Sequence, residues 1–216
     1  SLPAIIRATG LTQLSFYGDA DENCRAAKPF LDDPVPMVRM AAVGVYESIV
    51  PHLDMNEPYQ EDMLRGTAED LRPRIYPLLA LLDDPSRMVR TEAARIVSGI
   101  DYRVSRFVLE RDDREKMLEG LEELRVGMME SNDRAGAHAV MGNIYTNLGW
   151  FEKAEKAYEV AIHVEPTVTG PRTNLAELMD YHVSRLDREA RQLAQRRRME
   201  ELQKVAGQIA QYRLRA

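Results

Sequence analysis

The sequence predicts an all-α protein in which helix pairs stack into an α-solenoid. Aromatic residues make up only 6% of the 216 residues and charged residues 30%, which is typical of helices with one buried stripe and one hydrated face. Two segments align with each other without a gap. In a further segment, small and large residues alternate as in a closely packed helical hairpin. A chain of this length can also bury a sizeable core.

The hairpin pattern lies in residues 135–168. Small residues stand where two antiparallel helices must approach closely, and tyrosines stand where the hairpin has space to fill. A glycine falls at the turn, and a proline follows the second helix, which it cannot continue. The positions are Gly142, Tyr145, Gly149, Ala154, Tyr158, Ala161 and Pro166. They resemble a tetratricopeptide repeat of about 34 residues, which implies an architecture that binds or scaffolds without chemistry of its own.

A second repeat joins residues 32–49 and 83–100. Each copy begins with an Asp-Pro turn and continues as an amphipathic helix, and we expect Asp to cap this helix and Pro to occupy its first turn. Apolar helices are expected before both copies, around Phe30 and Leu31 and from Tyr76 to Leu82. The shared positions are Asp32/Asp83, Asp33/Asp84, Pro34/Pro85, Met37/Met88, Val38/Val89, Arg39/Arg90, Ala42/Ala93 and Ile49/Ile100.

These copies resemble HEAT repeats, in which a helix pair stacks its apolar face on its neighbours. The resemblance implies that Asp33 with Arg39, and Asp84 with Arg90, help to tie adjacent turns together.

The repeat extends toward the N-terminus but is not uniform in length. Arg7 matches Arg39, so residues 2–17 are interpreted as the second helix of an earlier unit. Each of the two copies begins with Asp-Asp-Pro, which we call the DDP turn. The extra length between the two DDP copies lies in residues 51–73, which are polar and interrupted by prolines. This segment predicts an elaborated connection that contains a short helix.

Residues 112–133 carry an apolar stripe at helical spacing. Gly120 and Gly127 are seven residues apart, as are Ala154 and Ala161 in the hairpin. We interpret this segment as the second helix of a degenerate tetratricopeptide unit.

Residues 174–179 begin a further helix, and 182–216 continue either as one long helix or as two helices broken near Arg196–Arg198. The tail has nine Lys/Arg and four Asp/Glu in a chain of net charge −6. Three interpretations stay open: a helix that caps the solenoid, a basic arm for an acidic partner, membrane surface or nucleic acid, and pairing with another chain. The pairing would use Leu202, Val205, Ile209 and Tyr212.

Nucleic-acid binding is the weakest use of this tail, because its arginine run lacks interleaved aromatics and the rest of the chain is acidic. The predicted domains are 1–103 with HEAT-like repeats, 104–181 with tetratricopeptide-like repeats, and the basic helical tail 182–216.

No catalytic, cofactor-binding or metal-binding constellation is predicted, and we expect no enzyme. The four histidines lack HxxxH or HExxH spacing, and no phosphate-binding glycine loop is present. The Asp pairs of the two DDP turns are explained by helix capping. Cys24 has no partner for a disulfide or a CxxC site, so we expect a buried apolar filler. No apolar run approaches the roughly 20 residues that span a bilayer.

A binding groove is the better candidate site. The first helix of a tetratricopeptide hairpin lines the concave groove, which implies that Ala139, Asn143, Thr146 and Asn147 point there, with Asn174 from the next helix. Some members of that family clamp a peptide carboxylate with Asn and Lys. Asn143 and Asn174 match the Asn positions, but Ala139 stands where the Lys is expected, so the clamp is incomplete and ordinary polar lining is the alternative.

The order of these segments resembles the C-terminal region of exported multihaem c-type cytochromes that carry both repeat types. The resemblance covers residues 2–181 and is clearest over 76–181. It implies a periplasmic or exported parent protein with haem c attached upstream at CxxCH motifs. This chain has no CxxCH, and Cys24 is followed by Arg-Ala-Ala, so we expect no cofactor here.

We therefore expect a non-catalytic protein-interaction or scaffold domain, the C-terminal module of such an electron-transfer protein. The chain begins without an initiator Met or signal peptide, so we interpret it as a piece of a longer protein. One alternative is a structural segment that packs on its own parent's haem domain, which predicts an exposed apolar patch. The other is a stand-alone cytoplasmic adaptor.

Overall fold

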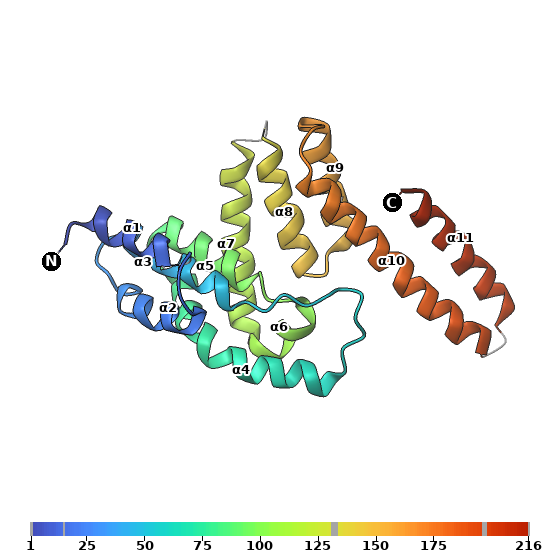
Figure 1. Cartoon of the computed structure of the whole chain (residues 1–216), viewed down its shortest axis with the longest axis horizontal. Coiled ribbons are helices and arrows are strands. Elements are labelled where there is room, and N and C mark those ends of the chain that lie inside the picture. The colour runs from blue at the N-terminus through green and yellow to red at the C-terminus, as the bar shows by residue number, and fades with distance from the viewer. Residues whose placement is uncertain (1, 15, 131–133, 196–197, 216) are drawn as a thin grey trace. The chain divides into compact units, whose positions relative to one another are not determined.

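The computed structural model describes residues 2–14, 16–130, 134–195 and 198–215. Over these ranges the protein is all-α, with helices and short 3-10 turns and no strand, as the sequence predicts (Figure 1). The chain divides into two compact units. The first comprises Ser1–His52, Tyr59–Glu130 and Asn147–Gly149, and the second comprises Leu53–Pro58, Ser131–Thr146 and Trp150–Ala216.

The first unit is built from two sets of helices. α3 packs on both α1 and α5, and α5 packs on α7, so alternate helices of the chain form a continuous row. α4 packs mainly on α6, and α2 packs beside α3. The α-helices are α1 (Ala4–Leu14), α2 (Ala20–Ala27), α3 (Pro36–Val45), α4 (Glu61–Leu79), α5 (Arg87–Val97), α6 (Tyr102–Val108) and α7 (Arg111–Met129).

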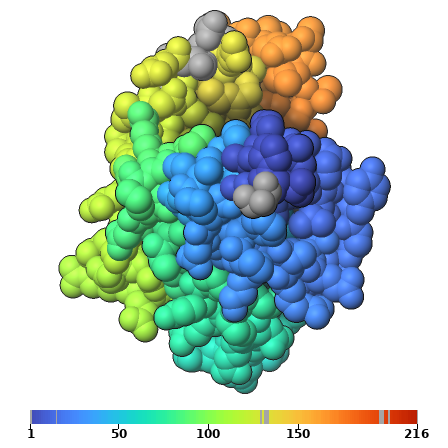
Figure 2. Space-filling view, turned by 90° about the vertical axis from the view of Figure 1, so that its left-hand side faces the viewer, coloured from blue at the N-terminus to red at the C-terminus, as the bar shows by residue number. Residues whose placement is uncertain are grey.

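The buried core of this unit extends along the row formed by α1, α3, α5 and α7. α1 and α7 lie at its two ends, and the α7 backbone approaches α5 closely, because a Cβ atom on Gly120 would lie 2.8 Å from that of Ala94. In the N-terminal segment, dark blue in Figure 2, Leu2 precedes α1 and is exposed, as are Ile5 and Ile6 of α1. The largest fully buried side chains are Val38, Val43, Val45, Leu71, Ile75, Leu78, Val89, Ile96 and Ile100.

The DDP turns are built differently from the expectation. α3 begins at Pro36 and α5 at Arg87, in each case two residues after the Pro of the turn. Asp33 Oδ1 accepts the N–H of Val35 at 2.9 Å, and Asp84 Oδ1 accepts that of Ser86 at 2.8 Å. The prediction that these Asp residues cap the helices was wrong: each closes the turn that precedes its helix.

Successive turns are joined by arginines. Arg39 donates from Nη1 to the backbone oxygen of Asp33 in its own turn, at 2.8 Å. Its Nε and Nη2 atoms donate to both carboxylate oxygens of Asp84 in the next turn, each at 2.8 Å. The ionic pairing therefore runs from one copy to the next, and not within a copy. Among the described residues, Arg7–Asp33 and Arg39–Asp84 are pairs of this kind, and Arg90 pairs in the same way with Glu123 of α7.

Helix α4 corrects the prediction for residues 51–73. The prolines there predict a connection with a short helix, but α4 begins at Glu61 and continues through Pro73 and Pro77. A proline inside a helix costs about 3 kcal/mol or more, whereas each fully buried large aliphatic side chain contributes about 1.5 to 3 kcal/mol. The apolar stripe outweighs the two prolines. It consists of Leu64, Ala68, Leu71, Ile75 and Leu78.

The second unit contains a hairpin followed by two long helices. α10 packs on α9 and α11, and α10 continues through residue 182 without a break. The predicted alternative of two helices in the tail fits the structure, although Arg196 and Arg197 lie outside the described residues. The helices are α8 (Ala135–Asn147), α9 (Phe151–Val164), α10 (Gly170–Gln195) and α11 (Met199–Arg215).

The apolar face of α11 is occupied within the chain. Val205 and Ile209 are buried against Leu186 and Leu193 of α10. Leu202 and Tyr212 pack against the same cluster. The pairing of this face with another chain, one of three interpretations of the tail, is therefore wrong for these residues.

The hairpin has the close approach that its residue sizes predict. A Cβ atom on Gly142 would lie 2.3 Å from Cε1 of Tyr158, so α8 and α9 can meet here only if position 142 is glycine. Ala154 and Ala161 are fully buried. Gly149 has φ +73°, a left-handed conformation that suits the turn after α8.

Candidate functional site

A polar cluster in the second unit contains three of the predicted groove residues. Tyr158 donates its hydroxyl hydrogen to Asn143 Oδ1 at 2.9 Å, and Asn174 Nδ2 donates to the same oxygen at 2.7 Å. Thr146 Oγ1 lies 3.1 Å from the Tyr158 hydroxyl and 3.0 Å from the backbone oxygen of Gly142. The cluster therefore links α8, α9 and α10.

Tyr158 is the centre of this cluster, although the sequence predicts only a space-filling role for it. Its side chain is 2% exposed. Burial raises the pKa of Tyr158 above its ordinary value, while the side chains of Thr146 and Asn174 act in the opposite direction. The phenol thus stays protonated near neutral pH and fixes the orientation of the Asn143 amide.

The orientation leaves polar atoms of both asparagines available. Asn143 is exposed and Asn174 half-buried. Within the described residues, neither Nδ2 of Asn143 nor Oδ1 of Asn174 has a hydrogen-bond partner. A peptide backbone offers the complementary acceptor and donor. The surface formed by these two amides, which we name the asparagine surface, is the candidate functional site.

The other two predicted residues do not belong to it. Ala139 is half-buried on α8 and offers no polar side chain. Asn147 ends α8 and is grouped with the first unit. The carboxylate clamp implied by the family resemblance thus still lacks its cation at position 139.

A second cluster in this unit surrounds a buried imidazole. His182 of α10 stacks on Tyr212 of α11, with ring centroids 4.6 Å apart, and meets Phe151 edge-on. Its Nε2 atom lies 3.2 Å from Oε1 of Glu155, whose other oxygen accepts from Arg215 at 2.8 Å. Neither ring nitrogen has a well-directed hydrogen bond within the described residues.

This cluster predicts a pH-dependent stability. Burial lowers the pKa of His182, and Arg185 lowers it further, against the opposing effect of Glu155 and Glu152. Unfolding therefore takes up a proton below about pH 6.5, the ordinary pKa of histidine. The free energy of unfolding should fall as the pH drops below that value, by at most about 1.4 kcal/mol per pH unit, and be unaffected by this group above it.

Urea unfolding between about pH 5 and 8 measures this effect. His182→Phe keeps an aromatic side chain in the stack and should flatten the acid side of the profile. Parallel profiles for the two proteins would contradict the assignment.

Cys24 is buried, as the sequence predicts, and burial raises the pKa of its thiol to about 11. No group of three or more His, Cys, Asp or Glu in the described ranges could hold a metal ion. None of the described helices combines the length and apolar character required to cross a membrane.

Comparisons with known proteins identify no relative: no family model, curated protein or solved structure matches the chain.

Proposed function

We propose that this chain is a non-catalytic helical-repeat module that binds a protein partner at the asparagine surface. The observation that carries the proposal is the Asn143 amide, whose oxygen is held by Tyr158 and Asn174 while its N–H₂ group is left to bind. A preorganised amide loses little conformational freedom when it binds, so its hydrogen bonds contribute more to affinity. An extended peptide segment is the natural ligand of such an amide.

We further propose that the module belongs to a periplasmic or exported multihaem c-type cytochrome involved in electron transfer. The order of the repeat segments over residues 2–181 supports this proposal. The haem would lie in an upstream part of that protein, and the chain would dock a partner for it. The full reading frame tests this point, because several CxxCH motifs upstream are expected, and their absence would contradict it.

The binding proposal is tested with a single-atom change. Asn143→Asp keeps the oxygen that Tyr158 and Asn174 bind, but replaces the free N–H₂ donor with a negatively charged acceptor. Proteins that the immobilised wild-type chain retains from a cell extract should be depleted about tenfold on this variant, which corresponds to about 1.4 kcal/mol. Quantitative mass spectrometry gives the comparison.

Asn147→Asp is the matched control, since it makes the same change on the same helix outside the cluster. It should retain the wild-type set of proteins. Equal retention by wild type, Asn143→Asp and Asn147→Asp would rule out the asparagine surface as the binding site.

A further inference from the structure

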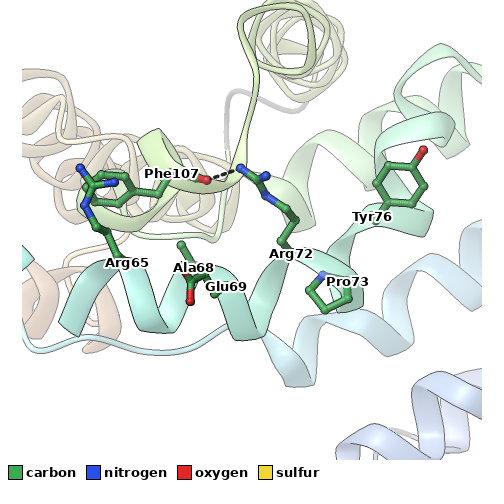
Figure 3. Close-up of a pocket in the computed structure, with 7 residues that line it drawn as sticks. All are labelled: Arg65, Ala68, Glu69, Arg72, Pro73, Tyr76 and Phe107. Carbon is green, nitrogen blue, oxygen red and sulfur yellow. Dashed lines mark hydrogen bonds between the residues drawn. The ribbon is translucent and has the colours of Figure 1, made fainter. Parts of the chain in front are cut away.

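A cavity of about 450 Å³ lies in the first unit between α4 and α6 (Figure 3). Its lining combines two arginines of α4 with an aromatic residue from each helix. Arg65 and Arg72 are seven residues apart, which places them on the same side of α4, about 10 Å apart along the helix axis. Phe107 comes from α6 and Tyr76 from α4.

Phe107 holds the guanidinium groups at this cavity. The Arg65 and Arg106 groups each lie over its ring, at 4.5 Å from the centroid. Arg72 donates from Nη2 to the Phe107 backbone oxygen at 2.6 Å. Stacked and hydrogen-bonded guanidinium groups are already oriented before a ligand arrives.

Donor groups remain available on both arginines that line the cavity. Arg65 uses Nε and Nη2 for Glu61, at 3.1 and 2.6 Å. Its Nη1 atom, and the Nε and Nη1 atoms of Arg72, have no partner within the described residues. Planar guanidinium groups with free donors match carboxylates, to which they give directed and charge-assisted hydrogen bonds.

The rest of the lining favours a peptide over a small anion. Ala68 is buried at the base, and Pro73 and Tyr76 are exposed beside it, with Tyr76 70% exposed. These groups offer apolar contact to a side chain next to a carboxylate. The chain as a whole has a net charge of −6, so this basic region is local and would attract an acidic segment to this site.

Glu69 restricts where a bound peptide can carry negative charge. Glu69 lies between Arg65 and Arg72 in the sequence of α4. It carries the one carboxylate among the described residues that line the cavity. A ligand with continuous negative charge would meet repulsion from Glu69. In a peptide with the polyproline II conformation, two carboxylates three residues apart lie on the same side of the peptide, about 9 Å apart at ~3.1 Å per residue, and so reach both arginines without a charge at Glu69.

We propose that the α4–α6 cavity binds an acidic peptide segment of a partner protein, with Arg65 and Arg72 each receiving one carboxylate and Tyr76 and Pro73 contacting an adjacent apolar side chain. This site lies in the first unit and uses none of the residues of the asparagine surface.

Selection of random peptides on the full chain tests the proposal. Phage-displayed peptides that the wild-type chain enriches should carry Asp or Glu at positions three apart, and their affinity should fall as salt is raised. Fluorescence anisotropy of the most enriched peptide should show about tenfold weaker binding to Arg72→Ala. Glu69→Gln should bind more tightly and tolerate a third carboxylate between the other two.

Two controls separate this site from other effects. Arg111→Ala removes an arginine whose side chain is 91% exposed elsewhere in the first unit, and should bind the peptide as the wild type does. Asn143→Asp should also bind it normally, so the two proposals can fail independently. Absence of an acidic preference, or equal peptide affinity for wild type, Arg72→Ala and Glu69→Gln, would overturn the proposal.

Discussion

Replacing Asp84 with Ala is expected to lower the free energy of unfolding of the first unit by about 3 to 5 kcal/mol. The Asp84 side chain is 5% exposed, and its carboxylate accepts two hydrogen bonds from Arg39 and one from the Ser86 backbone, each at 2.8 Å. Removal leaves the Nε and Nη2 atoms of Arg39, whose side chain is 12% exposed, without their acceptors. Urea unfolding followed by circular dichroism measures the loss.

The neighbouring Asp83 is the matched control. Its side chain is 61% exposed and contacts Lys116 at 2.6 Å near the surface, where ion pairs contribute little. Asp83→Ala should therefore change the stability only slightly. Similar losses for the two variants would contradict the role assigned to Asp84.

The Asp84 interaction also has a defined pH dependence. Burial of Asp84 opposes ionisation, but hydrogen bonds from Arg39 and Ser86 outweigh it, and the pKa of the carboxyl lies below its ordinary value. The stabilisation is thus present above about pH 4, the unfolded value, and is lost as the pH falls through the lower folded value.

Gly142→Ala is expected to destabilise the second unit by about 2 to 3 kcal/mol. Alanine favours a helix over glycine by up to about 1 kcal/mol, which acts in the opposite direction. The steric effect wins, because the new methyl group would lie 2.3 Å from Tyr158 Cε1 and displace the ring that holds Asn143. Thermal or urea unfolding, with partner capture as a second readout, measures both consequences.

Gly136→Ala on the same helix separates packing from helix propensity. Nothing lies within 4 Å of a Cβ atom at position 136, so this change should be neutral or slightly stabilising. In a Tyr158→Ala background, Gly142→Ala should lose most of its cost, since the clash is gone. Equal effects at positions 136 and 142 would contradict the close approach of α8 and α9.

Local chemistry made several elements predictable. Gly142 and Tyr158 have complementary sizes, so the hairpin could be inferred from a short stretch of sequence. The repeated Asp and Arg of the DDP copies likewise indicated a recurring contact. The sequence did not reveal that Arg39 pairs with Asp84 of the next copy, because that partner depends on how the helices stack.

The remaining features depend on distant contacts. The prolines of α4 predict an interruption, and only the sum of burial along one side of the helix shows why it continues. The groove residues Asn143 and Asn174 were predicted, but their link through the Tyr158 hydroxyl requires three helices to meet. The α4–α6 cavity had no signal in the sequence, since Phe107 is 35 residues from Arg72.

The most direct test of the account follows the asparagine amides during binding. A ¹⁵N-labelled chain is titrated with a purified protein that the wild type retains and Asn143→Asp does not. The side-chain N–H₂ resonances of Asn143 and Asn174 should shift, while those of Asn23, buried and bonded to the backbone of Leu14 and Tyr17, stay in place. Saturable binding that leaves the Asn143 and Asn174 resonances unmoved would contradict the account.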